Sequence, residues 1–127
     1  MFNENKDVSN VLGDKNRVRQ IVTNLIANAL NNTEKGYVSI SLSNEGNFVK
    51  TSVLDTGSGI QPENQKLLFR KFQQAGKDIY TRGSEKGIGM GLYISKLLVE
   101  DMGGDIWLEE TKVGVGSVFS FTLPAVV

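Results

Sequence analysis

The order of apolar and polar residues along the chain predicts a helix followed by a β-hairpin. From Asp14 onward apolar residues recur at steps of three and four, the spacing of one helix face, and Asp14 stands where an N-cap is favoured. Apolar residues and serines alternate over 38–43, which predicts a half-buried strand. Turn residues at 44–47 separate it from a second predicted strand at 48–55.

The second half of the chain predicts two more helices and two more strands. A glycine-rich loop at 56–59 precedes a short helix that begins near Pro62 and carries Leu67, Leu68, Phe69 and Phe72. Residues 73–87 show neither periodicity and predict a loop. The segment 88–102 is helical again, and its predicted apolar face holds Met90, Ile94, Leu97, Leu98 and Met102. The last strands are expected at 106–109 and 118–123, the second with Phe119, Phe121 and Leu123 on a single face. Short turns between consecutive strands predict an α+β two-layer sandwich, with a mixed, mainly antiparallel sheet covered on one face by helices.

The composition narrows the classes of function. The 127 residues suit one domain, expected over 1–127 with a poorly defined leader at 1–10. Lys and Arg number 14, as do Asp and Glu, so no net charge attracts nucleic acid or an anionic membrane. No apolar run is long enough to span a membrane. The absence of cysteine fits a reducing cytoplasm, and the absence of histidine excludes Ser-His-Asp catalysis and a histidine phosphoacceptor within the chain.

Asparagines fill the second half of the first predicted helix, although asparagine is a poor helix former. Asn24, Asn28 and Asn31 are spaced by four and three residues, so their amides project from one stripe of that helix. They are either a solvated polar stripe or a set of ligands that converges on one bound molecule.

An acidic residue and two glycines follow the second predicted strand. Asp55-Thr56-Gly57-Ser58-Gly59 predicts a tight turn that carries a carboxylate. A retroviral-type aspartic protease also presents its catalytic carboxylate in an Asp-Thr-Gly turn. Such a subunit is nearly all β, whereas the clearest periodicity of this chain is helical, so a protease is a distant alternative. A bare turn without function is the other alternative.

Glycines recur around the start of the helix predicted at 88–102, in Gly87-Ile88-Gly89-Met90-Gly91-Leu92. Glycines there let the backbone approach a phosphate, and the free amides of a helix N-terminus favour negative charge. The motif is not the dinucleotide fingerprint, since Leu92 stands where the third glycine would fall, and no Gly-Lys-Ser/Thr follows as in a Walker loop. Alone it is a weak indication of a phosphate site.

Together the motifs resemble one family. In chain order they are Asp14 to Thr33 with Asn24 and Asn28, Asp55-x-Gly57-x-Gly59, Phe69-x-x-Phe72, Gly87-x-Gly89-x-Gly91-Leu92 and Gly114-x-Gly116-Ser117-x-Phe119. Their order and spacing over residues 11 to 124 resemble the catalytic, ATP-binding domain (CA, HATPase_c) of two-component sensor histidine kinases. That domain belongs to the GHKL superfamily, which it shares with gyrase, heat-shock chaperone and mismatch-repair ATPases.

The resemblance implies an ATP site between the two long helices and the sheet, beneath a lid at 73–86. Asp55 matches the residue that accepts a hydrogen bond from the exocyclic amine of adenine. Asn28 matches the Mg²⁺ ligand, and Asn24 matches a second asparagine that faces the phosphates, so both are candidate catalytic residues. The other candidate contacts to the nucleotide or lid are Asn31, Gly57, Gly59, Ile60, Phe69, Phe72, Lys77, Arg82, Lys86, Gly87, Ile88, Gly89, Met90, Gly91 and Leu92.

Asn24 and the missing histidine distinguish between branches of the superfamily. In the ATPase branches the position that matches Asn24 is a glutamate, which acts as a general base and takes a proton from the attacking water. An amide cannot take that proton. The resemblance therefore implies a cytoplasmic protein-histidine kinase domain that transfers the γ-phosphoryl group of ATP to a histidine on a separate dimerisation domain, with a response regulator downstream. The isolated domain is expected to be monomeric and to contact neither nucleic acid nor membrane, any membrane anchor belonging to a parent protein.

Two positions depart from the family pattern. Asn31 and Gln74 stand where many members carry basic residues that reach phosphate oxygens. Lys77, Arg82 and Lys86 in the predicted lid are candidate substitutes. Because phosphoryl transfer depends on charge stabilisation, the alternative function is that of a nucleotide-binding pseudokinase, which holds a signalling partner without transferring phosphate.

Overall fold

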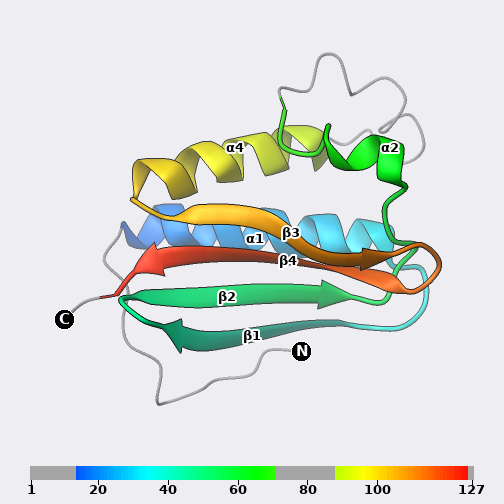
Figure 1. The fold of residues 1–127 in the computed structure, drawn as a ribbon, viewed down its shortest axis with the longest axis horizontal. Helices are drawn as coiled ribbons and strands as arrows, with labels where there is room; N and C mark the ends of the chain where they lie inside the picture. The colour runs from blue at the N-terminus through cyan, green and yellow to red at the C-terminus, as the bar shows by residue number, and fades with distance from the viewer. Residues whose placement is uncertain (1–13, 71–87, 126–127) are drawn as a thin grey trace.

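The computed structural model describes residues 14–70 and 88–125, with only the backbone described at 88–90. Its elements are α1 (Lys15–Asn32), β1 (Val38–Glu45), β2 (Phe48–Asp55), α2 (Pro62–Gln65), α4 (Ile88–Asp101), β3 (Asp105–Lys112) and β4 (Gly116–Pro124). The four strands form one sheet in the order β1-β2-β4-β3, and α1 and α4 lie side by side on one face of it (Figure 1). The predicted two-layer α+β sandwich is confirmed, and the pairings among the described strands are all antiparallel.

The predicted leader at 1–10 and the predicted lid at 73–86 lie outside the described residues. Within the described ranges, no helix is both long and apolar enough to cross a membrane.

The first helix forms where its periodicity predicts it. Asp14 caps it, since its Oδ1 accepts hydrogen bonds from the Asn16 and Arg17 amides at 2.8 and 3.4 Å. Ile21 and Leu25 are buried against the sheet at a spacing of four residues. The cap and the apolar face therefore both follow from local sequence.

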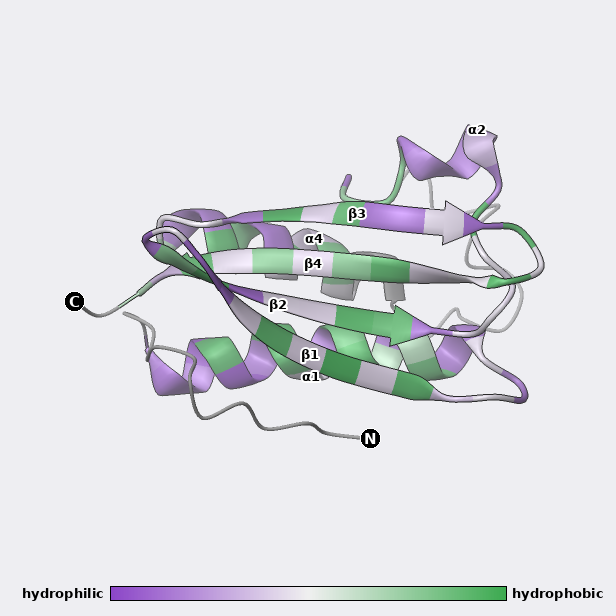
Figure 2. Cartoon of the chain, turned by 60° about the horizontal axis from the view of Figure 1, so that its bottom comes forward, coloured by the Kyte–Doolittle hydropathy of each residue, from purple (hydrophilic) through white to green (hydrophobic). Residues whose placement is uncertain are grey.

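The core lies between this helix layer and one face of the sheet. The strands alternate between hydrophobic and polar residues (Figure 2). Phe119, Phe121 and Leu123 of β4 share the buried face, as predicted, and each is at most 2% exposed. The alternation positions β2 so that Asp55 at its end also faces the helix layer, because Asp55 lies two residues beyond the buried Val53.

Two details of the predicted helices are wrong. The segment from Pro62 is helical only to Gln65, and Leu67–Phe69 follow it in a turn. Leu97, predicted on the buried face of α4, is 48% exposed. The buried stripe is instead centred on Leu92, Ser95 and Val99, and at 100° per residue Leu97 lies on the side opposite Ser95.

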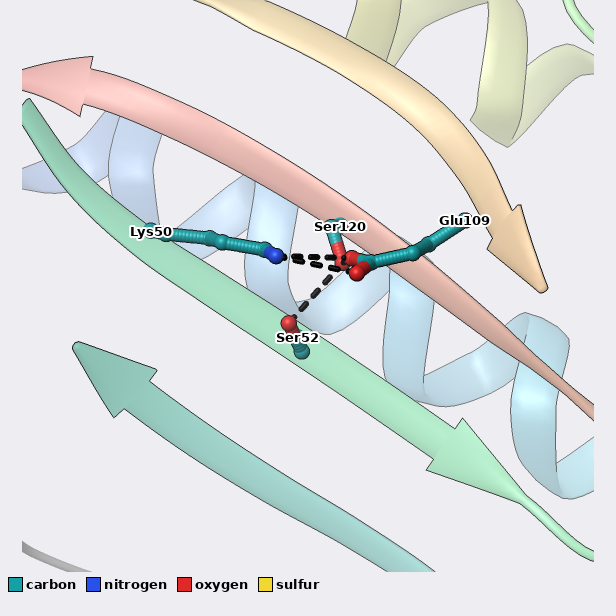
Figure 3. A network of polar contacts seen from close by, with 4 residues as sticks. All are labelled: Lys50, Ser52, Glu109 and Ser120. Atoms are coloured by element: carbon teal, nitrogen blue, oxygen red, sulfur yellow. Dashed lines mark hydrogen bonds and ion pairs between the residues drawn. The ribbon is translucent and has the colours of Figure 1, made fainter. Parts of the chain in front are cut away.

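The face of the sheet turned away from the helices carries a polar network (Figure 3). Glu109 lies where the register of β3 against β4 shifts. Its Oε1 accepts a 2.6 Å hydrogen bond from the Ser120 hydroxyl, and its Oε1 and Oε2 lie 2.9 and 3.0 Å from Lys50 Nζ. The Ser52 and Ser120 hydroxyls are 2.8 Å apart. The network therefore joins β2, β4 and β3.

Replacing Glu109 by glutamine should lower stability slightly and in a pH-dependent way. Hydrogen bonds from Ser120 and Lys50 lower the pKa of Glu109 below its usual 4.5. A carboxylate with a lowered folded-state pKa stabilises the fold above its unfolded pKa, and that contribution is lost as pH falls through the folded pKa. Since the side chain is partly exposed, we expect a loss below about 1 kcal/mol in urea unfolding at neutral pH and less at about pH 3.

The exposed neighbour Glu110 provides the control, since Glu110→Gln makes the same chemical change outside the network. An equal loss in both variants, or a loss from Glu109→Gln that does not shrink at low pH, would contradict a stabilising role for the Glu109 charge.

Candidate functional site

The end of β2 meets the C-terminal end of α1 at one end of the molecule (Figure 1). The Ser58 amide donates to the Asn32 carbonyl at 3.3 Å, and the Ser58 carbonyl accepts from the Gly114 amide at 2.7 Å. The Ile60 amide donates to the Thr111 hydroxyl at 3.0 Å. The loop after β2 is therefore fixed between α1 and the β3–β4 hairpin.

Asp55, the last residue of β2, is buried at 3% exposure. Its Oδ1 accepts a 2.9 Å hydrogen bond from the Gly57 amide, whereas Oδ2 is buried without a hydrogen-bond partner among the described residues. Burial raises the pKa of Asp55 above its usual 3.8, and the nearby backbone amides of Gly57 and Ser117 oppose the shift. Because a buried polar atom without a partner is costly, Oδ2 indicates a donor that a ligand would supply.

The two glycines of the loop have no room for a side chain. A Cβ on Gly57 would lie 2.1 Å from the Asn32 carbonyl oxygen and 2.9 Å from Asp55 Oδ1. Gly59 has a φ of 76°, and a Cβ there would lie 2.3 Å from the Lys112 carbonyl oxygen. The predicted tight turn at this place is confirmed, and glycine lets the loop lie directly against its neighbours.

Two hydroxyl residues beside Asp55 were not predicted as site residues. Ser117 on β4 is the register partner of Asp55 and is 5% exposed. Its hydroxyl lies 2.7 Å from the hydroxyl of Thr111 on β3. Ser117 could have been found, because strand alternation places it on the same face as the buried Phe119. The pair adds groups that can donate and accept next to the carboxylate.

The three asparagines of the predicted stripe have different environments. Asn28 is 4% exposed, and its Nδ2 is buried without a hydrogen-bond partner among the described residues. Asn24 donates through Nδ2 to the Gly91 carbonyl at 3.3 Å and to the Ser95 hydroxyl at 3.2 Å, both on α4. Asn31 is exposed and donates to a carbonyl of its own helix at 2.8 Å. The structure thus groups Asn24 and Asn28 and leaves Asn31 at the surface.

The apolar candidates line the boundary between site and core. Leu92 is 1% exposed and belongs to the core cluster. Ile60 and Phe69 are half-buried against that cluster. The ring of Phe69 meets Phe119 edge to face, with centroids 6.0 Å apart. Ile60 and Phe69 therefore keep a partly exposed side, and Leu92 does not.

Gly91 lies within α4, which begins at Ile88, so the predicted glycine motif overlaps the first turn of the helix. A Cβ on Gly91 would lie 3.6 Å from Asn24 Cγ, an ordinary van der Waals distance. Alanine therefore fits there sterically.

We expect Gly91→Ala to stabilise the domain by about 0.5–1 kcal/mol in urea unfolding, because alanine loses less backbone entropy than glycine in a helix. A loss of stability would contradict the helical placement. A loss of ATP affinity in the stabilised variant would support the predicted contact between phosphate and the Gly91 backbone, and unchanged affinity would count against it.

The remaining candidates lie wholly or partly outside the described residues. Phe72, Gln74, Lys77, Arg82, Lys86 and Gly87 lie outside the described residues, and of Ile88, Gly89 and Met90 only the helical backbone is described. In the described part of the chain, no group of three or more His, Cys, Asp or Glu side chains could hold a metal ion. The amide oxygen of Asn28 thus remains the predicted Mg²⁺ ligand, and Asn24 remains a predicted contact on the phosphate side.

The site has the chemistry of a purine-nucleotide-binding domain. A free carboxylate oxygen suits the exocyclic amine of a purine, and it lies beside hydroxyls that can donate and accept. Asn28 and Asn24 carry side-chain amides on α1, the helix whose last residue bonds the loop after Asp55.

Comparisons with known proteins agree with this class. Residues 13–127 match the sequence profile of the histidine kinase-, DNA gyrase B-, and HSP90-like ATPases. The signal transduction histidine-protein kinase BarA of Escherichia coli K12 is 41% identical over 117 residues, which cover 88% of this chain and 12% of BarA. Full-length ShkA in complex with AMPPNP aligns with a TM-score of 0.77 and 33% identity, over 94% of this chain and 24% of ShkA. A nucleotide-free catalytic domain of the histidine kinase ThkA aligns at 0.76 and 32% identity, over 98% of this chain and 77% of that domain.

The chain belongs to the histidine kinase-, DNA gyrase B- and HSP90-like ATPase family, as an ATP-binding catalytic domain of the sensor histidine kinase type. It spans 12% of the length of BarA. Neither the fold nor these relatives support the aspartic protease alternative.

Proposed function

We propose that this domain binds Mg²⁺-ATP and transfers the γ-phosphoryl group to a histidine on a separate dimerisation domain. The observation that carries the proposal is the buried Oδ2 of Asp55, which has no partner among the described residues. An ionised carboxylate only accepts hydrogen bonds, and the exocyclic amine of adenine donates them. The Gly57 amide holds the other carboxylate oxygen, which leaves Oδ2 for the base.

The direction of α1 supports a place for the phosphates. Asn32, the last residue of α1, bonds the loop after Asp55. Asn28 and Asn24 lie about one and two turns back from it, toward the N-terminus of the helix. At 1.5 Å per residue they lie about 6 and 12 Å along the axis from Asn32. A nucleotide laid along α1 with its base at Asp55 would therefore extend its phosphates toward these amides.

Asn28, with Asn24 beside it, provides the amide oxygens that a hard cation such as Mg²⁺ takes as ligands. When bound, the ion would neutralise charge on the phosphates. Asn24 cannot act as a general base, because an amide does not accept a proton at neutral pH. The contribution of this chain is therefore binding and orientation, which is what phosphoryl transfer requires.

The phosphoacceptor must come from another domain, because the chain contains no histidine. We infer that this domain acts in the cytoplasm as a monomeric unit of a larger signalling protein, with a response regulator as the final acceptor. Relatives that are named as signal transduction histidine kinases support the place in a signalling protein.

Incubation with γ-labelled ATP and the separately produced histidine-bearing domain of its parent protein tests the proposal. We expect an acid-labile, base-stable label on that domain, and none when Asp55→Asn replaces the wild type. A wild-type domain that binds ATP but leaves the partner unlabelled would be a pseudokinase and would overturn the proposed transfer.

A further inference from the structure

Ser95 occupies the centre of the buried face of α4, where an apolar residue is expected. It is 0% exposed and lies between the buried Leu92 and Val99. A buried hydroxyl needs hydrogen-bond partners. The Ser95 Oγ accepts a 3.2 Å hydrogen bond from Asn24 Nδ2, which comes from the neighbouring helix.

The contacts on α4 determine which atom of Asn24 is free. A backbone carbonyl only accepts hydrogen bonds, so the carboxamide atom that lies 3.3 Å from the Gly91 oxygen must be the nitrogen. The same NH₂ group also donates to Ser95. With both of its hydrogens directed to α4, the carboxamide has its oxygen Oδ1 left for a ligand.

We propose that Ser95 is a positioning residue that acts through Asn24 and holds its carboxamide so that an acceptor oxygen faces the phosphate end of the site. This inference rests on the proposed function. Phosphate oxygens also accept, so Oδ1 of Asn24 does not suit a bare phosphate. It suits a cation or a water molecule bound to one, and Asn24 therefore contributes to binding of the magnesium complex and not of the metal-free nucleotide.

A double-mutant cycle on AMPPNP affinity tests the coupling of the two residues. Calorimetry is carried out on the wild type, Asn24→Ala, Ser95→Ala and the double variant, once with Mg²⁺ and once with a chelator. Each single variant should lose affinity for Mg²⁺-AMPPNP by about threefold to tenfold, the range of one neutral hydrogen bond. The double variant should lose no more than Asn24→Ala, and affinity without metal should not change.

Ser120 provides a matched control. It is also 0% exposed and also hydrogen-bonded through its hydroxyl, but it lies in the polar network on the opposite face of the sheet (Figure 3). Ser120→Ala should bind Mg²⁺-AMPPNP as tightly as the wild type. An equal loss in Ser120→Ala and Ser95→Ala would reduce Ser95 to a general structural role and overturn the inference.

A second measurement requires no nucleotide. The side-chain amide protons of Asn24 should exchange slowly with solvent in nitrogen-15 NMR spectra, and faster in Ser95→Ala. Unchanged exchange, additive losses in the cycle, or an equal loss of affinity with and without Mg²⁺ would each overturn the inference. Failure of the wild type to bind AMPPNP in either buffer would instead overturn the proposed function, and the exchange measurement would still decide the role of Ser95.

Discussion

Replacing Asp55 by asparagine should abolish ATP binding and leave the nucleotide-free domain at least as stable as the wild type. The asparagine oxygen can still accept from the Gly57 amide, but its NH₂ group then faces the adenine amine, donor against donor. Loss of a buried, charge-assisted hydrogen bond together with this repulsion predicts an affinity more than about 100-fold lower. Calorimetry with Mg²⁺-ATP measures it.

The expected gain in stability follows from the pKa of Asp55. Burial raises this pKa above 3.8, so the contribution of the group to stability is present below that value and is lost as pH rises through the folded-state pKa. At neutral pH the ionised carboxylate therefore opposes folding, and the neutral amide removes that opposition. Thermal unfolding at pH 7 compares the two proteins without nucleotide.

The exposed Asp105 provides the control for both measurements, since Asp105→Asn makes the same substitution away from the site. Retained ATP affinity in Asp55→Asn would disprove adenine recognition by this carboxylate. A lower unfolding temperature in Asp55→Asn than in Asp105→Asn would show that the charge is favourable in the free domain.

Replacing Gly57 by alanine should destabilise the domain by about 3 kcal/mol, because the new methyl group would overlap backbone that cannot move independently. Its Cβ would lie 2.1 Å from the Asn32 carbonyl oxygen at the end of α1. Relief of that overlap requires the loop and α1 to separate. Urea unfolding measures the loss, and ATP affinity should fall as well, because the Gly57 amide orients Asp55.

Gly114 separates this steric effect from backbone strain. Its φ is 84°, but a Cβ there would meet no atom within 4 Å. Gly114→Ala should therefore cost only about 1 kcal/mol, the strain of a left-handed backbone. Equal losses in the two variants would contradict the close approach of Gly57 to α1.

The elements that the sequence predicts well are those with local causes. Asp14 caps α1 through amides two and three residues ahead, and α4 ends before Gly103, which adopts a φ of 89°. The strands follow from alternation, in which successive residues point to opposite faces of the sheet. In each case the relevant neighbours lie within a few residues along the chain.

The sequence predicts less well which side chains of α4 are buried, because residues far away along the chain determine this. Leu97 has the hydropathy of a core residue, but Ser95 takes the buried position because Asn24, 71 residues away, supplies its hydrogen bond. Gly91 falls inside the helix predicted at 88–102, but only the structure shows that its place within α4 leaves room for a methyl group beside Asn24. The periodicity of one segment contains no information about the residues of other elements that pack against it.

The amino-acid sequence alone determined the class of fold, the order of the elements and the residue types that could bind adenine and a cation. The tertiary structure decided which atoms of those residues are free. Asp55 Oδ2 lacks a partner among the described residues because the sheet and the loop bury it. Asn24 donates its NH₂ group to α4, whereas Asn31 donates to a carbonyl of its own helix. The donor and acceptor atoms of a side chain bond to the polar groups that packing brings within about 3 Å, and packing can bring such groups from distant parts of the chain.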